Sequence, residues 1–255
     1  MKAFVLAAGL GTRLRPFTLE HPKALVPVGG VPMLQRVLLR LKGEGFDEVI
    51  INVHHFADQI EEFLAANGNF GLRISISDER AALLDTGGAL LHAARLIGED
   101  DEPMLVHNVD ILSDAPLRRL MQAHKESGRM ATLLVSSRES SRRLAFDSED
   151  RLCGWTNLAD GSTKPAGFKV AAGHRLYAFS GIHAVTPSLL ADAMRRQGRG
   201  GAFPIVDFYL DESSGGSVGC FYEENLRLID IGKPATLAQA DTLIKDYGAA
   251  GNDRN

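Results

Sequence analysis

The first half of the chain alternates short apolar segments with longer stretches in which apolar residues recur at helical spacing. Five segments rich in β-branched residues predict strands, at residues 3–8, 48–53, 73–77, 104–109 and 130–135. Apolar residues fall on one helix face within residues 33–42, 60–64 and 90–96. This repeated alternation predicts an α/β, Rossmann-like fold in which helices flank a mostly parallel sheet.

The second half of the chain is less regular. Residues 141–170 mix charges with Gly and Pro, and we expect them to form a lid or one wall of a ligand site. Residues 178–185 and 217–222 predict two further strands. Because no repeat or Pro-rich linker marks a boundary, we expect one domain over residues 1–247 and a small, polar, frayed tail at 248–255.

A glycine-rich, basic segment follows the first predicted strand. Gly9 and Gly11 come directly after it, and the cations Arg13, Arg15 and Lys23 come next. Glycine lets the backbone approach a ligand closely, so that its N–H groups converge on an anion, while Arg and Lys bind phosphate oxygens. Since ligands of such sheets lie beyond the carboxyl ends of the strands, the segment predicts a phosphate-binding loop for a nucleotide.

The kind of nucleotide site is narrowed by exclusion. The dinucleotide fingerprint G-x-G-x-x-G needs a third glycine where the chain has Leu14. The string G-x-x-x-x-G-K-[ST] of P-loop proteins occurs nowhere in the sequence. An NAD-dependent oxidoreductase and the kinase-type and GTPase-type phosphate loops are therefore disfavoured.

Composition narrows the expected binding partners and the expected cellular compartment of the protein. The net charge of −4 argues against nucleic acid or a membrane surface as a partner. Cys153 and Cys220 form no C-x-x-C pair, and the first apolar segment is too short for a secretion signal, so we expect a cytoplasmic protein. We also expect a monomer or a small homo-oligomer.

The loop and the residues after it resemble the signature of the sugar-1-phosphate nucleotidyltransferases. The matching positions are the string LAAGLGTRL at residues 6–14, then Pro16, Thr18, Pro22, Lys23, Leu25, Pro27, Val28, Gly30, Pro32 and Met33. The resemblance implies an enzyme that joins a nucleoside triphosphate to a sugar 1-phosphate, releases pyrophosphate and uses Mg²⁺. The short chain looks closest to the bacterial branch that includes the N-acetylmuramate-1-phosphate uridylyltransferases, although guanylyl- and thymidylyltransferases share the loop.

The resemblance also implies roles for individual residues. For the nucleotide these are Leu6, Ala7, Ala8, Gly9, Gly11, Thr12, Arg13, Glu79, Gly87 and Gly88; for catalysis Arg13, Lys23 and Asp110; for the metal Asp110 and Asp230; and for the sugar Asn108, Ser180 and Gly181. Arg13 would hold the departing phosphates, and Lys23 would bridge the reacting ones. In-line transfer of this kind needs alignment and charge neutralisation but no covalent intermediate.

Simpler structural roles stay open for several of these residues. Asp110 could cap the next helix, although Asp114 suits that role better, and Asp230 could be a salt-bridged or capping aspartate. The segment Thr86-Gly87-Gly88, which resembles the family's base-contacting segment, could instead be a plain helix entry with Thr86 or Asp85 as its N-cap.

The residues expected around the sugar 1-phosphate depart from the family pattern. Val109 stands where a small residue is expected before the metal aspartate, and Lys233 replaces a threonine. The family's Glu-Lys-Pro string is missing, because the Lys164-Pro165 pair follows Thr163. The identity of the sugar and of the base is therefore left open.

A basic cluster and an inactive form of the protein allow two further interpretations. The cluster Arg138, Arg142 and Arg143 is expected to be a solvated face rather than a second phosphate site. The chain could also be a catalytically inactive regulatory subunit that binds nucleotide sugars, but such a binder would not need Asp110 and Asp230 together.

Overall fold

A ten-stranded sheet forms the centre of the protein, in the order β11-β10-β9-β12-β6-β1-β4-β5 with β8 beside β12 and β13 beside β8. The computed structural model describes residues 1–98, 101–232, 235–237 and 239–240. The strands of this sheet are β1 (Lys2–Leu6), β4 (Glu48–Val53), β5 (Arg73–Asp78), β6 (Met104–Asn108), β8 (Ala131–Ser136), β9 (Arg142–Phe146), β10 (Leu152–Asn157), β11 (Thr163–Lys164), β12 (Arg175–Val185) and β13 (Val218–Tyr222).

The strand directions confirm the mostly parallel α/β sheet and define its functional edge. β1 runs parallel to β4 and β6, β4 to β5, and β8 to β13. β12 runs antiparallel to both β6 and β8, so β6 and β8 point the same way. The carboxyl ends of β1, β4, β6 and β8 therefore meet at one edge of the sheet.

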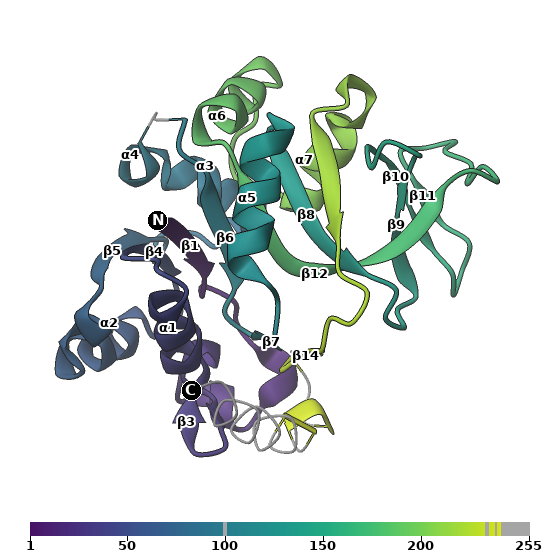
Figure 1. The fold of residues 1–255 in the computed structure, drawn as a ribbon. Helices are drawn as coiled ribbons and strands as arrows, with labels where there is room; N and C mark the ends of the chain where they lie inside the picture. Colours follow the sequence, from purple (N-terminus) through teal and green to yellow (C-terminus); the bar gives the residue numbers. More distant parts are fainter. Residues whose placement is uncertain (99–100, 233–234, 238, 241–255) are drawn as a thin grey trace, which may run out of the picture.

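Helices cover both faces of this sheet, as Figure 1 shows. They are α1 (Met33–Gly43), α2 (Ala57–Ala66), α3 (Asp85–His92), α4 (Ala94–Ile97), α5 (Leu117–Ser127), α6 (Pro187–Arg196) and α7 (Ile205–Asp211). Leu38 of α1, Ile60 of α2 and Leu120 of α5 lie in one buried cluster. Leu90 of α3 and Phe208 of α7 lie in a second cluster, on the other face. Each helix thus buries its apolar stripe against the β-branched side chains of the strands.

Two smaller pairings hold segments beside the functional edge. β2 (Pro27–Val28) pairs with β3 (Val31–Pro32), and β7 (Ile111–Ser113) pairs antiparallel with β14 (Leu228–Asp230). β7 follows β6 closely in the chain, whereas β14 comes from more than a hundred residues later. The second pairing therefore brings the end of the described chain back to the sheet edge.

The predicted strands are confirmed to within three residues at either end, the largest difference being the start of β12 at Arg175, but the predicted apolar face within residues 90–96 is partly wrong. The helix divides into α3 and α4 at Ala93, so Ala93 and Ile97 are buried while Leu96 is 44% exposed. Residues 141–170 extend the sheet through β9, β10 and β11, which lie to one side of the parallel core (Figure 1). The predicted tail at 248–255 lies outside the described residues.

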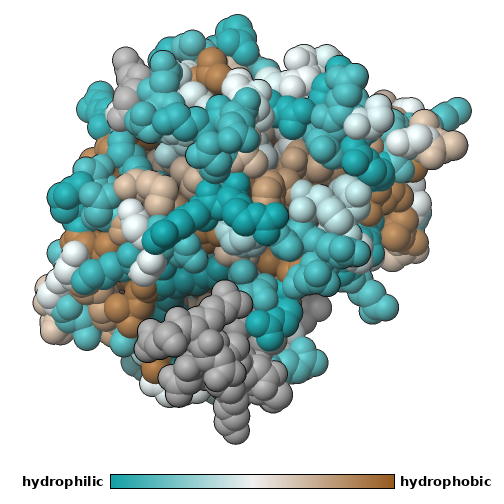
Figure 2. All heavy atoms as spheres, viewed as in Figure 1, coloured by the Kyte–Doolittle hydropathy of each residue, from teal (hydrophilic) through white to brown (hydrophobic). Residues whose placement is uncertain are grey.

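The visible surface is mostly hydrophilic, and its apolar residues are spread over several small areas (Figure 2). Among the described residues, no helix is long and apolar enough to cross a membrane.

Candidate functional site

A cavity of about 460 Å³ opens at the carboxyl edge of the parallel strands. Its wall includes the ends of β1 and β6, where Leu6 and Asn108 lie in register. The lining residues are Leu6, Ala8, Gly9, Lys23, Asn52, Glu79, Leu83, Asp85, Thr86, Asn108, Val109, Asp110 and Ala202. The cavity therefore lies where the topology of an open α/β sheet favours a ligand.

The glycine loop is fixed at one end and open at the other. Gly11 has φ 62°, and a Cβ there would lie 2.9 Å from Lys23 Cβ and from Thr18 Cγ2. The Thr18 hydroxyl donates to the Gly11 carbonyl at 2.9 Å. By contrast Gly9 is exposed in the cavity wall, and none of the described atoms comes within 4 Å of its Cβ position. A ligand can thus approach the backbone at Gly9 while Gly11 holds the turn.

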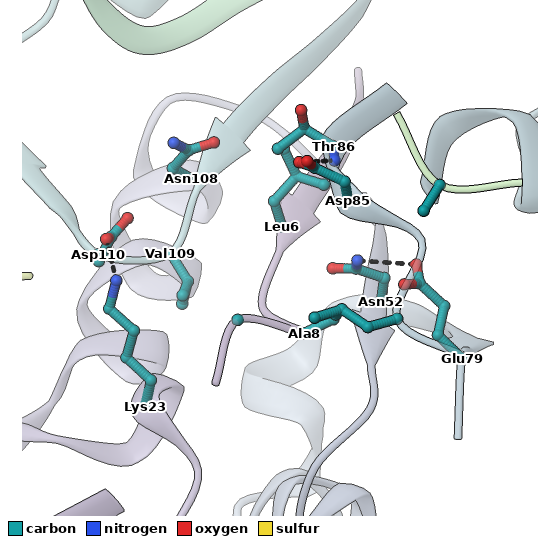
Figure 3. Close-up of a pocket in the computed structure, with 13 residues that line it drawn as sticks. Leu6, Ala8, Lys23, Asn52, Glu79, Asp85, Thr86, Asn108, Val109 and Asp110 are labelled. Atoms are coloured by element: carbon teal, nitrogen blue, oxygen red, sulfur yellow. Dashed lines mark hydrogen bonds and ion pairs between the residues drawn. The ribbon is translucent and has the colours of Figure 1, made fainter. Parts of the chain in front are cut away.

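An ion pair joins this loop region to the end of β6. The Lys23 ammonium binds the Asp110 carboxylate, and the two side chains are 14% and 17% exposed. Both residues line the cavity and point toward each other (Figure 3). The positive charge is therefore held beside a carboxylate that faces the ligand space.

A second carboxylate lies next to this pair. Asp230 is in register with Ile111 in the β7–β14 ladder, and the Ile231 N–H donates to the Asp110 carbonyl at 2.9 Å. Asp230 Oδ1 accepts a bond from the Gly232 N–H at 2.7 Å. A Cβ on Gly232 would lie 2.7 Å from both Asp230 Oδ1 and Arg13 Nη2, so the Arg13 guanidinium lies beside Asp230.

The two aspartates suit a divalent cation that shares its coordination with a ligand. Mg²⁺ is commonly held by one or two carboxylates and completes its shell with water and phosphate oxygens. Asp110 and Asp230 come from neighbouring backbone segments and could contribute one carboxylate each. Among the described residues there is no group of three or more His, Cys, Asp or Glu side chains that could hold a metal by themselves.

The opposite end of the cavity carries a buried amide and a buried carboxyl group. Asn52 Nδ2 donates to Glu79 Oε1 at 2.8 Å, and Asn52 Oδ1 accepts a bond from the Ala7 N–H at 2.6 Å. Burial raises the pKa of Glu79, and the hydrogen bond from Asn52 opposes that rise. Figure 3 shows this pair apart from Lys23 and Asp110, with Leu6 between them. The cavity thus has one end with fixed charges and one end with hydrogen-bonding groups.

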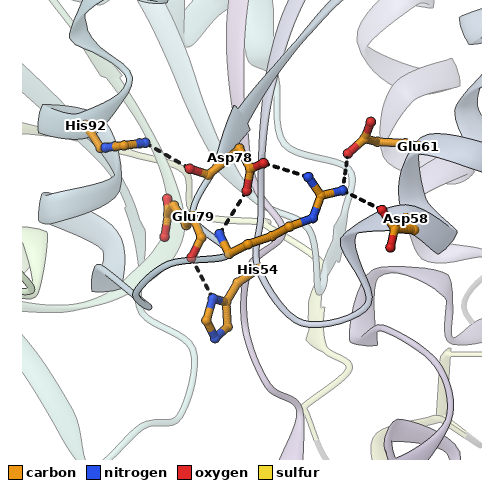
Figure 4. A network of polar contacts seen from close by, with 7 residues as sticks. His54, Asp58, Glu61, Asp78, Glu79 and His92 are labelled. Carbon is orange, nitrogen blue, oxygen red and sulfur yellow. Dashed lines mark hydrogen bonds and ion pairs between the residues drawn. The ribbon is translucent and has the colours of Figure 1, made fainter.

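The turn that carries Glu79 is held by an exposed ion network (Figure 4). The Arg80 guanidinium binds Asp78, Asp58 and Glu61 at 2.6 to 2.7 Å, which ties the end of β5 to α2. His54 Nδ1 donates to the Glu79 carbonyl at 2.7 Å. Exposed pairs contribute little stability one by one, but together they restrict where this turn can lie.

Comparisons with known proteins agree with this geometry. A family model described as nucleotidyl transferase matches residues 2–146. The N-acetylmuramate alpha-1-phosphate uridylyltransferase of Caulobacter vibrioides is 34% identical over 251 residues, which cover 96% of this chain and 97% of that protein. The chain belongs to the nucleotidyl transferase family. The resemblance predicted from the loop is therefore confirmed.

Other relatives are similar over a smaller part of the chain or only in fold. A mannose-1-phosphate guanyltransferase of Gibberella zeae is 37% identical over 140 residues, 54% of this chain and 38% of that protein. The structure of HddC from Yersinia pseudotuberculosis in complex with GMP-PN has a TM-score of 0.72 at 20% identity and covers 95% of this chain and 99% of that one. A Bacillus anthracis protein assigned as a glucose-1-phosphate thymidylyltransferase has a TM-score of 0.76 at 20% identity, over 96% of both chains.

Within this nucleotidyl transferase, many of the residues predicted for the nucleotide lie at the cavity. Leu6, Ala8, Gly9 and Glu79 line it, and Ala7 is attached to the lining through Asn52. Thr12 is exposed at the start of a short 3-10 helix and lies outside the lining.

Gly87 and Gly88 pack closely against residues 201–203. Their N–H groups donate to the Phe203 carbonyl at 2.8 and 3.3 Å. A Cβ on Gly87 would lie 2.2 Å from the Phe203 ring, and one on Gly88 would lie 2.4 Å from the Gly201 carbonyl oxygen. Neither glycine lines the cavity, and their contact with the base stays a prediction.

Of the three residues predicted to bind the sugar, Asn108 lines the cavity, whereas Ser180 and Gly181 do not. A Cβ on Gly181, which has φ 77°, would lie 2.9 Å from Asn108 Nδ2. The Ser180 side chain is buried, bonds with the backbone of Ile182 and does not line the cavity. Val109 is 3% exposed at the wall, and Lys233 lies outside the described residues.

Two of the simpler structural expectations are wrong. Asp114 caps no helix: it accepts from the Arg227 backbone at 2.9 Å and side chain at 2.7 Å, while α5 begins after Pro116 without a side-chain cap. Asp85 is the first residue of α3 rather than its N-cap, and its carboxylate accepts from the N–H of the next residue at 2.6 Å.

Three lining residues, Asn52, Leu83 and Ala202, were not predicted from the sequence. Asn52 did leave a signal, because it is a polar residue inside an apolar strand and is only 3% exposed. A buried amide needs hydrogen-bond partners, and here they come from the loop and from Glu79.

Proposed function

We propose that this protein is a Mg²⁺-dependent sugar-1-phosphate nucleotidyltransferase that uses UTP and N-acetylmuramate 1-phosphate. The observation that carries the reaction type is the cluster of Lys23, Asp110, Asp230 and Arg13 beside an open glycine loop. The substrate pair is supported by the Caulobacter vibrioides relative, whose similarity covers nearly the whole of both chains.

In the proposed reaction, an oxygen of the sugar phosphate attacks the α-phosphorus of the triphosphate. The bond between the α-phosphorus and the bridging oxygen breaks, and pyrophosphate leaves with that oxygen. No proton has to move, because the attacking phosphate is already ionised at neutral pH. The chain therefore has to align the groups and neutralise their charge.

Each charged residue has a task in this scheme. The backbone at Gly9 and Gly11 lies against the triphosphate, and Arg13 binds the departing phosphates with its planar fork. Lys23 provides a compact positive charge beside the α-phosphate. Asp110 and Asp230 would hold Mg²⁺, which supplies charge neutralisation on the phosphate oxygens when bound.

The base lies at the Asn52 and Glu79 end in this proposal. One oxygen of Glu79 accepts from Asn52, and the other accepts from the Leu84 N–H at 3.3 Å, which leaves further lone pairs on both. The carboxyl group retains capacity for an N–H group, which uracil, thymine and guanine all carry. We assign the choice of uracil to the relative's similarity rather than to these two side chains.

The test is pyrophosphate release by the purified protein, with four nucleoside triphosphates against a panel of sugar 1-phosphates that includes N-acetylmuramate and mannose. We expect the highest kcat/KM for UTP with N-acetylmuramate 1-phosphate, and release slowed at least a hundredfold by Asp110→Asn in a parallel assay. Release with another pair would correct the substrates alone. The absence of release with every pair, together with tight binding of a nucleotide sugar, would support the inactive regulatory subunit instead.

A further inference from the structure

Arg138 lies at the same sheet edge as the candidate site. It follows β8 by two residues, and β8 points in the same direction as β6 because both are antiparallel to β12. In the sheet, β12 and β8 lie on one side of β6 and β1 lies on the other. Arg138 therefore approaches the aspartates from the opposite side to the loop that carries Arg13 and Lys23.

The guanidinium of Arg138 is half-buried and only partly satisfied. Its Nη2 donates to the Phe179 carbonyl at 2.9 Å, which fixes the group against β12. Its Nη1 makes only a long contact, 3.4 Å to the Glu139 carbonyl, and its buried Nε has no hydrogen-bond partner among the described residues. Burying a charged donor without partners is costly, so an anion at this group would remove a penalty that the free protein carries.

The charges around Arg138 connect it to the aspartate pair. Burial lowers its pKa, the negative charge of Asp230 opposes that fall, and the positive charge of Arg143 adds to it. Arg143 is half-buried and donates its Nε to the Ser140 carbonyl at 3.1 Å. Arg138 thus lies within electrostatic reach of the Asp230 carboxylate on one hand and of the Arg143 guanidinium on the other.

The anchor of Arg138 also connects it to the cavity wall. Phe179 is followed by residues 180–181, and Gly181 packs against the side chain of Asn108, which lines the cavity. Lys164, a cation on strand β11, already has a partner: its Nζ binds Asp207 at 2.7 Å and lies 5.8 Å from the Trp155 ring. Arg138 is therefore the better placed of the two for an anion at the wall.

The chemistry of the proposed function requires such a cation. In-line transfer brings the acceptor phosphate to the α-phosphorus from the side opposite the departing pyrophosphate. With Arg13 and Lys23 assigned to the triphosphate, the acceptor phosphate needs its own positive charge, on the far side of the aspartates. Arginine presents a planar fork that suits phosphate oxygens.

We propose that Arg138 binds the phosphate group of the sugar 1-phosphate. The inference rests on the proposed function for the identity of the ligand, and it replaces our expectation that this arginine is part of a solvated face. Arg138 is then a substrate-binding residue of the acceptor site, while Arg142, exposed on β9, has no such role.

The test compares Arg138→Met, Arg138→Lys and the matched control Arg142→Met in steady-state assays with UTP and N-acetylmuramate 1-phosphate. Since a hydrogen bond to a charged group contributes about 1.5–3 kcal/mol, we expect Arg138→Met to raise KM for the sugar phosphate roughly 10- to 100-fold. KM for UTP and the Mg²⁺ concentration for half-maximal rate should stay within about twofold. Arg138→Lys should recover part of the loss, and Arg142→Met should match the wild type.

Two results would overturn the inference. One is an unchanged KM for the sugar phosphate in both Arg138 variants. The other is a parallel rise in the Mg²⁺ requirement, which would make Arg138 a positioning residue for Asp230. Far-UV circular dichroism and thermal unfolding check the fold, and the lysine variant provides the answer if the methionine variant does not fold.

A calorimetric titration with N-acetylmuramate 1-phosphate and with inorganic phosphate separates this inference from the proposed function. If the wild type binds the sugar phosphate, Arg138→Met does not, and no turnover occurs, the inference holds and the proposed activity fails. If the wild type binds neither ligand, the inference is overturned. Equal binding of inorganic phosphate by wild type and Arg138→Met overturns it as well.

Discussion

Replacing Asp110 by asparagine tests the centre of the site, because it removes the charge and keeps the shape. In the free protein the Lys23 ammonium would lose its partner while the two positions remain 14% and 17% exposed. At a separation of about 4 Å and an effective dielectric constant of about 20, two unit charges attract by about 4 kcal/mol. Desolvation offsets part of this attraction, and a hydrogen bond to a charged group has a net value of about 1.5–3 kcal/mol.

We therefore expect Asp110→Asn to lower the free energy of unfolding by about 2 kcal/mol. Lys23→Met should also destabilise the protein, since it leaves the largely buried Asp110 carboxylate without its ammonium partner. The double variant should recover part of the loss, because neither partner is then left unpaired. The expected coupling energy is about 1–3 kcal/mol.

Urea unfolding of the four proteins at neutral pH with a chelator present measures this coupling. The matched control is a cycle on Asp114 and Arg227, an ion pair at 2.7 Å whose side chains are 31% and 47% exposed. Exposed pairs are worth about 0.2–1 kcal/mol, so the control coupling should be clearly smaller. Additive effects at Lys23 and Asp110, within about 0.3 kcal/mol, would refute the argument that this pair is a shielded interaction.

The same variant has an expected effect on turnover. Removing one preorganised electrostatic group typically costs about 10²–10³ in kcat, so Asp110→Asn should lose at least a hundredfold, and a chelator should abolish wild-type turnover. Activity that survives both treatments would remove Asp110 and the metal from the mechanism, even if the stability coupling is found.

Three further predictions concern the glycines and acid stability. Gly87→Ala should lower the free energy of unfolding by about 1–3 kcal/mol in urea unfolding, because its Cβ would lie 2.2 Å from the Phe203 ring, whereas Gly9→Ala, with open space, should change it by less than about 0.5 kcal/mol. Gly11→Ala should cost about 1–3 kcal/mol in the same assay because of its φ of 62° and its close neighbours, and wild-type stability would contradict the tight turn. Burial lowers the pKa of His183 to about 3, so the unfolded state binds more protons than the folded state between that pH and about pH 6.5, and the free energy of unfolding falls as the pH is lowered through this range. His183→Leu should therefore reduce the slope of the unfolding free energy against pH. An unchanged slope would show that His183 does not cause this acid sensitivity.

Much of the fold could be predicted because its strands are short, buried and bounded by glycine or charge. The segment 48–53 has the same bounds in the sequence and in the structure, since β-branched residues there fill both faces of a buried strand. The apolar face at 90–96 could not be predicted in the same way. A periodic pattern assumes one continuous helix, and the break at Ala93 rotates the buried face from Leu96 to Ile97.

In the site, too, some residues are positioned by the local sequence and others by contacts with distant segments. The loop at Gly9 and the aspartate at 110 each follow a predicted strand, so the topology alone brings them to one edge. The contact of Gly87 with Phe203 joins segments more than a hundred residues apart, and no local pattern contains it. The position of Arg138 could not be predicted either, because the sequence of a basic cluster is the same whether its arginine lies in solvent or packs against β12.

Of the two aspartates assigned to Mg²⁺, one follows a central strand and the other depends on a distant pairing. Asp110 is carried by the end of β6, a buried central strand, whereas Asp230 is held by the three-residue β14, whose partner β7 is equally short. Short ladders with partly exposed residues open at lower free energy than central strands. The loop and the Asp110 side should therefore stay formed in the free protein, while the Asp230 side is the more easily opened part of the site. A ligand that joins the two aspartates would stabilise this weaker side, and hydrogen exchange at the N–H of Ile231, which donates to the Asp110 carbonyl, reports it directly.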